Sequence, residues 1–102
     1  MTITSRGRLD VALKRHADAR KALAGWKQIT IEADWQDLQD VRRAYASADG
    51  VEVASGRIVT VFNIRGNNYR LLTTIDYELG AVQVLDLLTH AEYDKEKWKK
   101  TL

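Results

Sequence analysis

The chain has 102 residues, of which 45% are apolar and 29% charged, a balance typical of one soluble globular domain. Cysteine is absent and histidine occurs only twice. This excludes a disulfide framework and a cysteine nucleophile, and argues against a thiolate or histidine-rich metal site. The net charge is +2, so any polyanion-binding surface must arise from where the charges lie. We expect one domain spanning residues 1–102.

Basic residues are concentrated in part of the second half. No acidic residue occurs between Glu52 and Asp76, whereas three arginines do. These are Arg57, Arg65 and Arg70. This distribution suits a polyanion-binding face, and ordinary solvated surface charge is the alternative interpretation.

No apolar run approaches the roughly 20 residues that a membrane span needs. Residues 1–10 also lack the apolar centre of a signal peptide. We therefore expect a cytoplasmic protein without membrane contact.

The first half shows helical periodicity. Apolar residues recur every three or four positions after Ser5, after Asp18 and after Asp34 or Asp37, and each of these polar residues can cap a helix. Three helices are predicted. Gly25 lies inside the second helix, where glycine costs about 1 kcal/mol relative to alanine, so we expect close packing there.

The period then changes to that of strands. β-branched and aromatic residues predict strands at residues 58–64, 68–77 and 82–89. Turns are expected at 65–67 and 78–80, and Val51 and Val53 indicate a further short strand. Residues 91–98 are predicted to form a last short helix. The order indicates an α+β fold, with N-terminal helices on one face of an antiparallel sheet of three to four strands and the other face free for a ligand.

One constellation with chemical potential is the turn after residue 64. A Gly-Asn turn flanked by Arg65 and Arg70 can present backbone N–H groups and guanidinium groups to a phosphate. An ordinary hairpin turn has the same pattern, so this signal is weak by itself.

A second constellation joins the last strand to the last helix. His90 can transfer protons near neutral pH, Tyr93 offers a phenol and an aromatic face, and Lys95 adds a cation. Thr89 and Glu92 fit a capping box, which in the alternative interpretation makes His90 an ordinary first-turn residue.

The three tryptophans form a third set. Trp26 is predicted to lie in the core. Trp35 and Trp98 are predicted to cover the core, with base stacking as the alternative.

The register of the last two predicted strands decides whether the first two constellations meet. Arg70 and His90 share a face of the sheet only where paired residue numbers sum to an even value, as when Arg70 pairs with Leu88 or with His90. A slip of one residue would separate them.

Two segments together resemble the HigB toxins, which belong to the RelE-like toxin endoribonucleases. They are VFNIRGNNYRL at residues 61–71 and THAEYDK at residues 89–95. The resemblance extends over roughly residues 6–97, and these two motifs are specific in their order and spacing.

This resemblance implies a bacterial type II toxin that cleaves mRNA, often on the translating ribosome, and that is held in check by a HigA antitoxin with a helix-turn-helix domain. It implies cleavage without a metal or another cofactor, in which the ribose 2′-OH attacks the adjacent phosphate and the 5′-oxygen leaves.

The resemblance also implies roles for individual residues. Arg70 would stabilise charge on the phosphate, and His90 would transfer a proton. Tyr93 would act as an acid or as a stacking surface, and Lys95 as a supporting cation. The RNA backbone would contact Arg57, Arg65, Asn67 and Asn68.

Two positions depart from the family pattern. Leu88 stands where the family commonly has glycine, and Asn68 where it often has a basic residue. Either change could reduce activity. The alternative to an enzyme is therefore a non-catalytic module of the same fold that binds RNA or an antitoxin.

Overall fold

A computed structural model describes residues 1–102 apart from the side chain of Arg6. The predicted α+β class is confirmed. In chain order the elements are β1 (Thr2–Thr4), α1 (Arg6–Arg15), the short 3₁₀ turn η1 (Ala17–Ala19), α2 (Arg20–Glu32), α3 (Leu38–Ala44), β2 (Asp49–Glu52), β3 (Ile58–Ile64), β4 (Tyr69–Asp76), β5 (Ala81–Thr89), α4 (His90–Asp94) and α5 (Lys97–Thr101).

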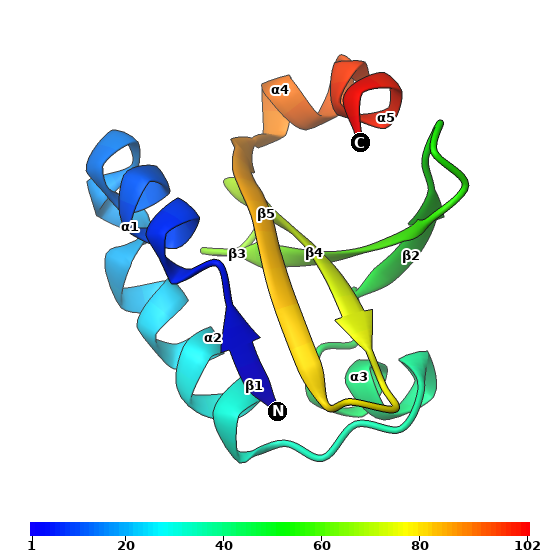
Figure 1. Cartoon of the computed structure of the whole chain (residues 1–102). Coiled ribbons are helices and arrows are strands. Elements are labelled where there is room, and N and C mark those ends of the chain that lie inside the picture. The colour runs from blue at the N-terminus through cyan, green and yellow to red at the C-terminus, as the bar shows by residue number, and fades with distance from the viewer.

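The sheet has five strands in the order β1-β5-β4-β3-β2 (Figure 1). The expected antiparallel sheet of three to four strands is present as β2 to β5, and β1 adds a parallel strand beside β5. We did not predict β1 because three residues are too short to show an alternating pattern.

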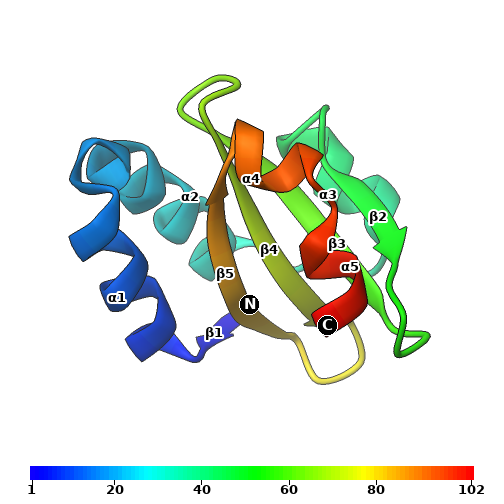
Figure 2. The same ribbon diagram turned by 90° about the horizontal axis from the view of Figure 1, so that it is seen from above.

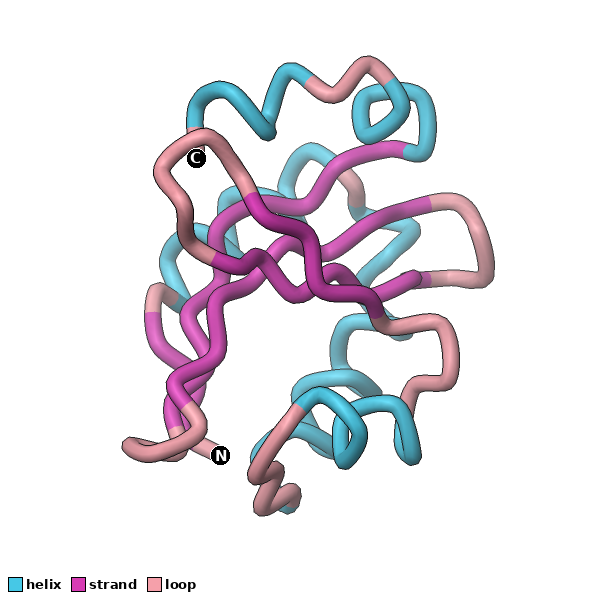
Figure 3. Tube along the Cα trace, turned by 90° about the vertical axis from the view of Figure 1, so that its right-hand side faces the viewer, coloured by secondary structure: helices cyan, strands magenta, loops and turns pink.

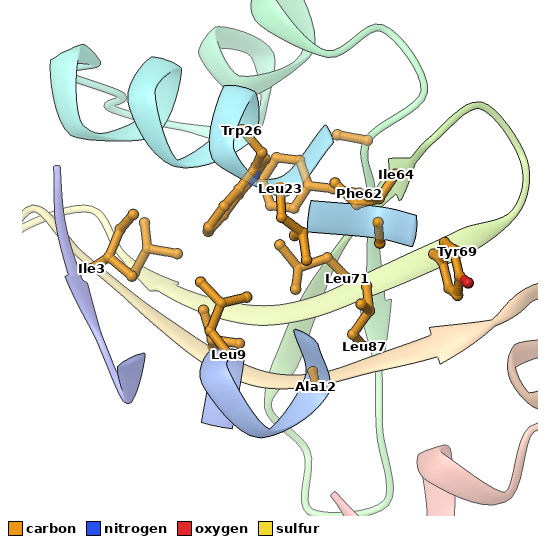
Figure 4. Packing of buried hydrophobic residues seen from close by; sticks show 14 of the residues in the cluster. Ile3, Leu9, Ala12, Leu23, Trp26, Phe62, Ile64, Tyr69, Leu71 and Leu87 are labelled. Carbon is orange, nitrogen blue, oxygen red and sulfur yellow. The ribbon is translucent and has the colours of Figure 1, made fainter. Parts of the chain in front are cut away.

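The main hydrophobic core lies between the sheet and the N-terminal helices (Figure 4). Trp26 from α2 meets Phe62 from β3 edge-on, with ring centroids 5.5 Å apart, and both side chains are fully buried. The ring of Trp35 also stacks on that of Phe62, with ring centroids 6.1 Å apart. The predicted core positions of Trp26 and Trp35 are therefore confirmed.

The opposite face of the sheet carries a second, smaller cluster. It contains Val59, Leu72, Leu88 and the buried Trp98 of α5. Figures 2 and 3 show the C-terminal helices on the side of the sheet away from the N-terminal helices. The face that we expected to be free is therefore partly covered, and the position of Trp98 as a cover of the core is confirmed.

Local caps differ from the sequence patterns. Asp37 caps α3 as predicted, by accepting a 2.9 Å hydrogen bond from the Asp40 N–H. Ser5 precedes α1 but makes no capping bond, and Asp18 does not cap α2 because η1 intervenes. The prediction of close packing at Gly25 is wrong, because a Cβ atom added to this residue would have no other atom within 4 Å.

The predicted single C-terminal helix is divided into α4 and α5. Glu96 separates them with a positive φ of 60°. Within the described part of the chain, no helix combines the length and apolarity that crossing a bilayer requires.

Candidate nucleic-acid interface

Arg70 lies near the start of the central strand β4, with its side chain on the face of the sheet opposite the main core. It pairs with Leu88 in β5, which is one of the two predicted registers, and with Asn63 in β3. Its side chain is only 9% exposed, and its Nη1 donates hydrogen bonds to the carbonyl oxygens of Asn67 (3.2 Å) and Tyr69 (3.1 Å). The sheet thus holds this guanidinium in a fixed orientation.

The guanidinium of Arg70 faces the ring of Tyr93 in α4. Its central carbon lies 5.6 Å from the ring centroid, which is the geometry of a cation–π contact. Trp98 stacks on the same phenol ring at 5.0 Å with an interplanar angle of 17°, and its Nε1–H donates to the Tyr93 carbonyl at 3.0 Å. The indole therefore fixes both the ring and the backbone of Tyr93.

The environment of Tyr93 keeps its hydroxyl protonated. Burial raises the pKa of Tyr93 above its ordinary value of 10.0, and the nearby Asp49 carboxylate raises it further, against the opposing effects of Lys99 and Arg70. At neutral pH the phenol is therefore a hydrogen-bond donor.

His90 is the first residue of α4, directly after the end of β5. Its backbone N–H donates to the Asn68 carbonyl at 3.0 Å, which ties the start of the helix to the β3–β4 turn. The ring is half-exposed, and its Nε2 lies 3.4 Å from Asp94. Because residues three and four apart share one side of a helix, His90 lies beside Tyr93.

The predicted capping box at the start of α4 is confirmed. Thr89 Oγ1 accepts from the Glu92 N–H at 3.1 Å, and the Glu92 carboxylate accepts from the Thr89 N–H at 2.9 Å. This second bond lowers the pKa of Glu92 below its ordinary value. The box orients the helix that carries His90 and Tyr93.

The β3–β4 turn presents Asn67 and Asn68 to solvent, as expected. Positive φ values fall on Arg65 (54°) and Gly66 (62°), whereas we had expected them at Gly66 and Asn67, and the Asn68 N–H donates to the Arg65 carbonyl at 3.2 Å within the turn. The Asn63 amide reaches Asn67 at 3.5 Å.

Arg65 does not point toward Arg70. Its Nη1 forms an ion pair with Asp18 at 2.8 Å, and the other oxygen of this carboxylate accepts a hydrogen bond from the Tyr69 hydroxyl. That hydrogen bond from Tyr69, followed by Arg65, lowers the pKa of Asp18. Arg65 is thus directed to the helical side of the turn, while half of its side chain stays accessible.

Two other predicted residues lie apart from Arg70. Arg57 lies before β3, at the opposite end of that strand from Arg65, and its Nε donates to the Leu102 carbonyl at 3.2 Å. Lys95 ends α4 and lines a cavity of about 330 Å³ together with Leu88 and Trp98.

Sequence reasoning missed the contributions of Asn63 and Trp98. Asn63 lies directly opposite Arg70, and register arithmetic across the β3–β4 turn could have placed it there. Trp98 has no sequence signal that would link it to Tyr93. Among the described side chains, no group of three or more His, Asp or Glu residues is placed to hold a metal ion.

Comparison with protein families gives a match over most of the chain. Residues 19–96 match the HigB toxin family, described as the RelE-like toxic component of a toxin–antitoxin system. The matched segment includes Arg70, His90 and Tyr93, whereas α1 and α5 lie outside it. A search of curated proteins finds no match.

Proposed function

The chain belongs to the HigB family of RelE-like toxins of toxin–antitoxin systems, and from this we propose that it is an endoribonuclease that cleaves mRNA on the translating ribosome. The observation that supports the proposal is the contact of Arg70 with Tyr93 on the face of the sheet away from the main core, with His90 in the same short helix as Tyr93. These residues supply a fixed cation, a neutral phenol and an imidazole.

The proposed reaction uses a nucleophile that the substrate itself carries. The ribose 2′-oxygen loses its proton and attacks the adjacent phosphorus, and the bond from phosphorus to the 5′-oxygen breaks. The leaving oxygen gains a proton. The products are a 2′,3′-cyclic phosphate and a 5′-hydroxyl, so we expect the reaction to proceed in the presence of a chelator.

Each residue of the group can serve one of these needs. Arg70 has guanidinium N–H groups beyond Nη1, and these can bind the phosphate oxygens as negative charge develops. His90 is exposed and can exchange a proton with the ribose or with the leaving oxygen. Tyr93 keeps its hydroxyl proton and can donate it to the phosphate or to the leaving oxygen.

The residues around this group would bind the RNA. Asn67 and Asn68 are exposed at the turn and can contact the backbone, and the accessible half of Arg65 can do the same. Lys95 follows α4 and lines the cavity beside Leu88, where it would add positive charge. Contact with Arg57 would require an RNA strand that runs the length of β3.

The partners follow from the class of protein. A toxin of a toxin–antitoxin system requires an antitoxin, and we propose one of the HigA type with a helix-turn-helix domain. Action on translating ribosomes places the protein in the cytoplasm.

The test is induction of the chain in growing cells, with mapping of the 5′ ends of mRNA. Wild type, Arg70→Ala and His90→Ala are compared, and Arg43→Ala on the exposed surface of α3 is the matched control. We expect growth arrest and new 5′ ends for wild type and control. Loss of His90 should lower the cleavage rate of the purified protein by about 10²- to 10⁴-fold.

Two outcomes would contradict the proposal in different ways. Normal growth and no new ends with wild type would remove the nuclease and leave a binding module, an outcome to which Leu88 and Asn68 could contribute. Undiminished cleavage by both variants would keep the nuclease and discard these residue assignments.

A further inference from the structure

The outer edge of β5 is only partly covered by a strand. On that side β1 pairs with Ala81 to Gln83 and then ends, whereas β4 pairs along the other side as far as Thr89 (Figure 1). Residues 84–89 therefore present an edge about 20 Å long with no strand beside it. This length suits one ordinary strand of five to six residues.

Side chains take the place of a strand along this edge. The Leu87 N–H donates to the Asp86 carboxylate at 2.8 Å, and the Leu87 carbonyl accepts from Arg15 at 3.4 Å. Two residues further on, the Thr89 N–H donates to Glu92 at 2.9 Å. In a strand, the backbone N–H and C=O groups of alternate residues point to the same side. The bonds at Leu87 and Thr89 therefore show that the backbone groups of these residues point away from β4, toward the free edge.

Two cavities flank this edge and share Asp86. One, of about 290 Å³, lies against α1 and is lined by Val11 and Arg15, and the other, of about 330 Å³, is lined by Trp98 of α5. Val11 is 60% exposed, so its apolar side chain is available for contact with a ligand in this cavity. We call residues 84–89 and the two cavities the edge groove.

The charge of the edge groove favours an acidic ligand. Its basic residues are Arg8, Arg15, Lys95 and Lys97, and its acidic residues are Asp86 and Glu92. Asp86 pairs with Arg15 at 3.4 Å, a long contact between half-exposed groups that can be exchanged at little cost.

We propose that the antitoxin binds in the edge groove, where an extended segment with acidic and apolar side chains adds as a strand beside residues 84–89 of β5. Its backbone would replace the side-chain bonds to Leu87, its apolar side chains would cover Val11, and its carboxylates would meet Arg8 and Arg15. Strand addition of this kind draws affinity from the backbone and specificity from alternate side chains. This inference rests on the proposed function, which supplies the antitoxin.

Other occupants fit the edge groove less well. RNA has no peptide backbone to pair with the free edge of residues 84–89 and no aliphatic side chain to cover Val11. A second copy of the chain would bring two edges of the same positive charge together, because symmetric pairing places like surfaces opposite each other.

The test measures neutralisation and binding with substitutions outside the nuclease residues. The probe is the purified product of an adjacent gene that forms a complex with the chain on co-expression, and its affinity is measured by isothermal titration calorimetry. Val11→Glu and Arg8→Glu place negative charge in the edge groove. Their matched controls are Ile29→Glu and Arg20→Glu, which place the same charge on exposed positions of α2.

We expect both groove variants to stay toxic but to bind the purified antitoxin about tenfold or more weakly, as for residues at the centre of an interface. Both controls should bind within about two- to threefold of wild type. Binding of wild type should also slow amide exchange at Leu87 and Thr89.

The inference fails if the groove variants bind as tightly as wild type, if the control variants lose affinity equally, or if exchange at Leu87 is unchanged in the complex. It also fails if neither adjacent gene product binds the chain. Calorimetry needs no nuclease activity, so a wild type that does not arrest growth would contradict the proposed function while binding still decides this inference. Pairing of two toxin chains or retention of RNA at the groove would likewise overturn it.

Discussion

The two faces of the sheet use the same strands for different purposes. On the helical face, Phe62 and Leu71 are completely buried against α2. On the opposite face, the neighbouring residues in the same strands are Asn63 and Arg70, which lie at the margin of a smaller apolar cluster. Stability and chemistry are thus separated by the alternation of side chains along each strand.

The proposed role of Arg70 requires a guanidinium that is both buried and available to a ligand. Arg70 is 9% exposed, yet it is held by backbone carbonyls and a phenol ring, with no acidic partner among the described residues. A carboxylate beside it would satisfy its charge permanently. Arg65 on the other side of the same turn shows the contrast, because Asp18 pairs with it.

The largest expected effect comes from the helical face. Phe62→Ala should lower the free energy of unfolding by about 3–5 kcal/mol, because the ring is fully buried and contacts Trp26, Trp35 and Tyr45. Urea denaturation measures this change. The control is Ile58→Ala in the same strand, which is 54% exposed and should change stability by about 0.5 kcal/mol or less.

The next effect belongs to the opposite face and should spare stability. Arg70→Lys keeps the charge but loses the planar fork, and we expect cleavage to fall by about 10²- to 10³-fold. Cleavage of a synthetic RNA under single-turnover conditions, together with the urea midpoint, separates the two quantities. A loss of stability as large as that of Phe62→Ala would break the distinction between the faces.

A smaller loss of stability is expected at the start of α4, where the capping box joins the helix to the end of β5. Thr89→Ala removes the capping oxygen that accepts from Glu92, and we expect a loss of about 0.5–2 kcal/mol in stability. Cleavage should fall as well, because His90 and Tyr93 lose their fixed helix. Thr89→Ser keeps the cap and should retain both properties, as thermal unfolding and the cleavage assay can show.

The smallest effect concerns pH. The pKa of Asp18 lies below its ordinary value of 3.8 in the folded protein, chiefly because of the hydrogen bond from Tyr69. Its contribution to stability is therefore present above pH 3.8 and is lost as the pH falls through the lowered value. Tyr69→Phe should move the pKa of Asp18 back toward 3.8, and NMR of the carboxyl group can measure this change. An unmoved titration would assign the shift to Arg65 instead.

The sequence patterns predicted the central strands because long alternating segments leave few consistent pairings. They left both Leu88 and His90 open as partners of Arg70, and the structure shows Leu88. They missed β1, which is too short for a pattern. They also placed Asp18 at a helix cap, although its carboxylate binds residues about 50 positions away, and such long-range pairs have no local signature.

Part of the candidate site, like part of the fold, could be predicted from the sequence. The motif residues Arg70, His90 and Tyr93 are identified by their neighbours in sequence, and the structure brings Arg70 into contact with Tyr93, in the helix that His90 begins. The assignment of Arg57 depended on charge, and that of Lys95 on its place at the end of the second motif, and neither carries information about the direction of the side chain. Their positions at the far end of β3 and on the side of the β5 cavity could emerge only from the folded chain.

The stacking of Trp98 on Tyr93 has a practical consequence for observing this protein. Trp26 and Trp35 lie on the helical face, so the two faces carry separate indole chromophores. A Trp26→Phe, Trp35→Phe variant would leave a single fluorophore 5.0 Å from the phenol beneath Arg70. Its emission would report arrival of a nucleotide in real time, without any label on the RNA.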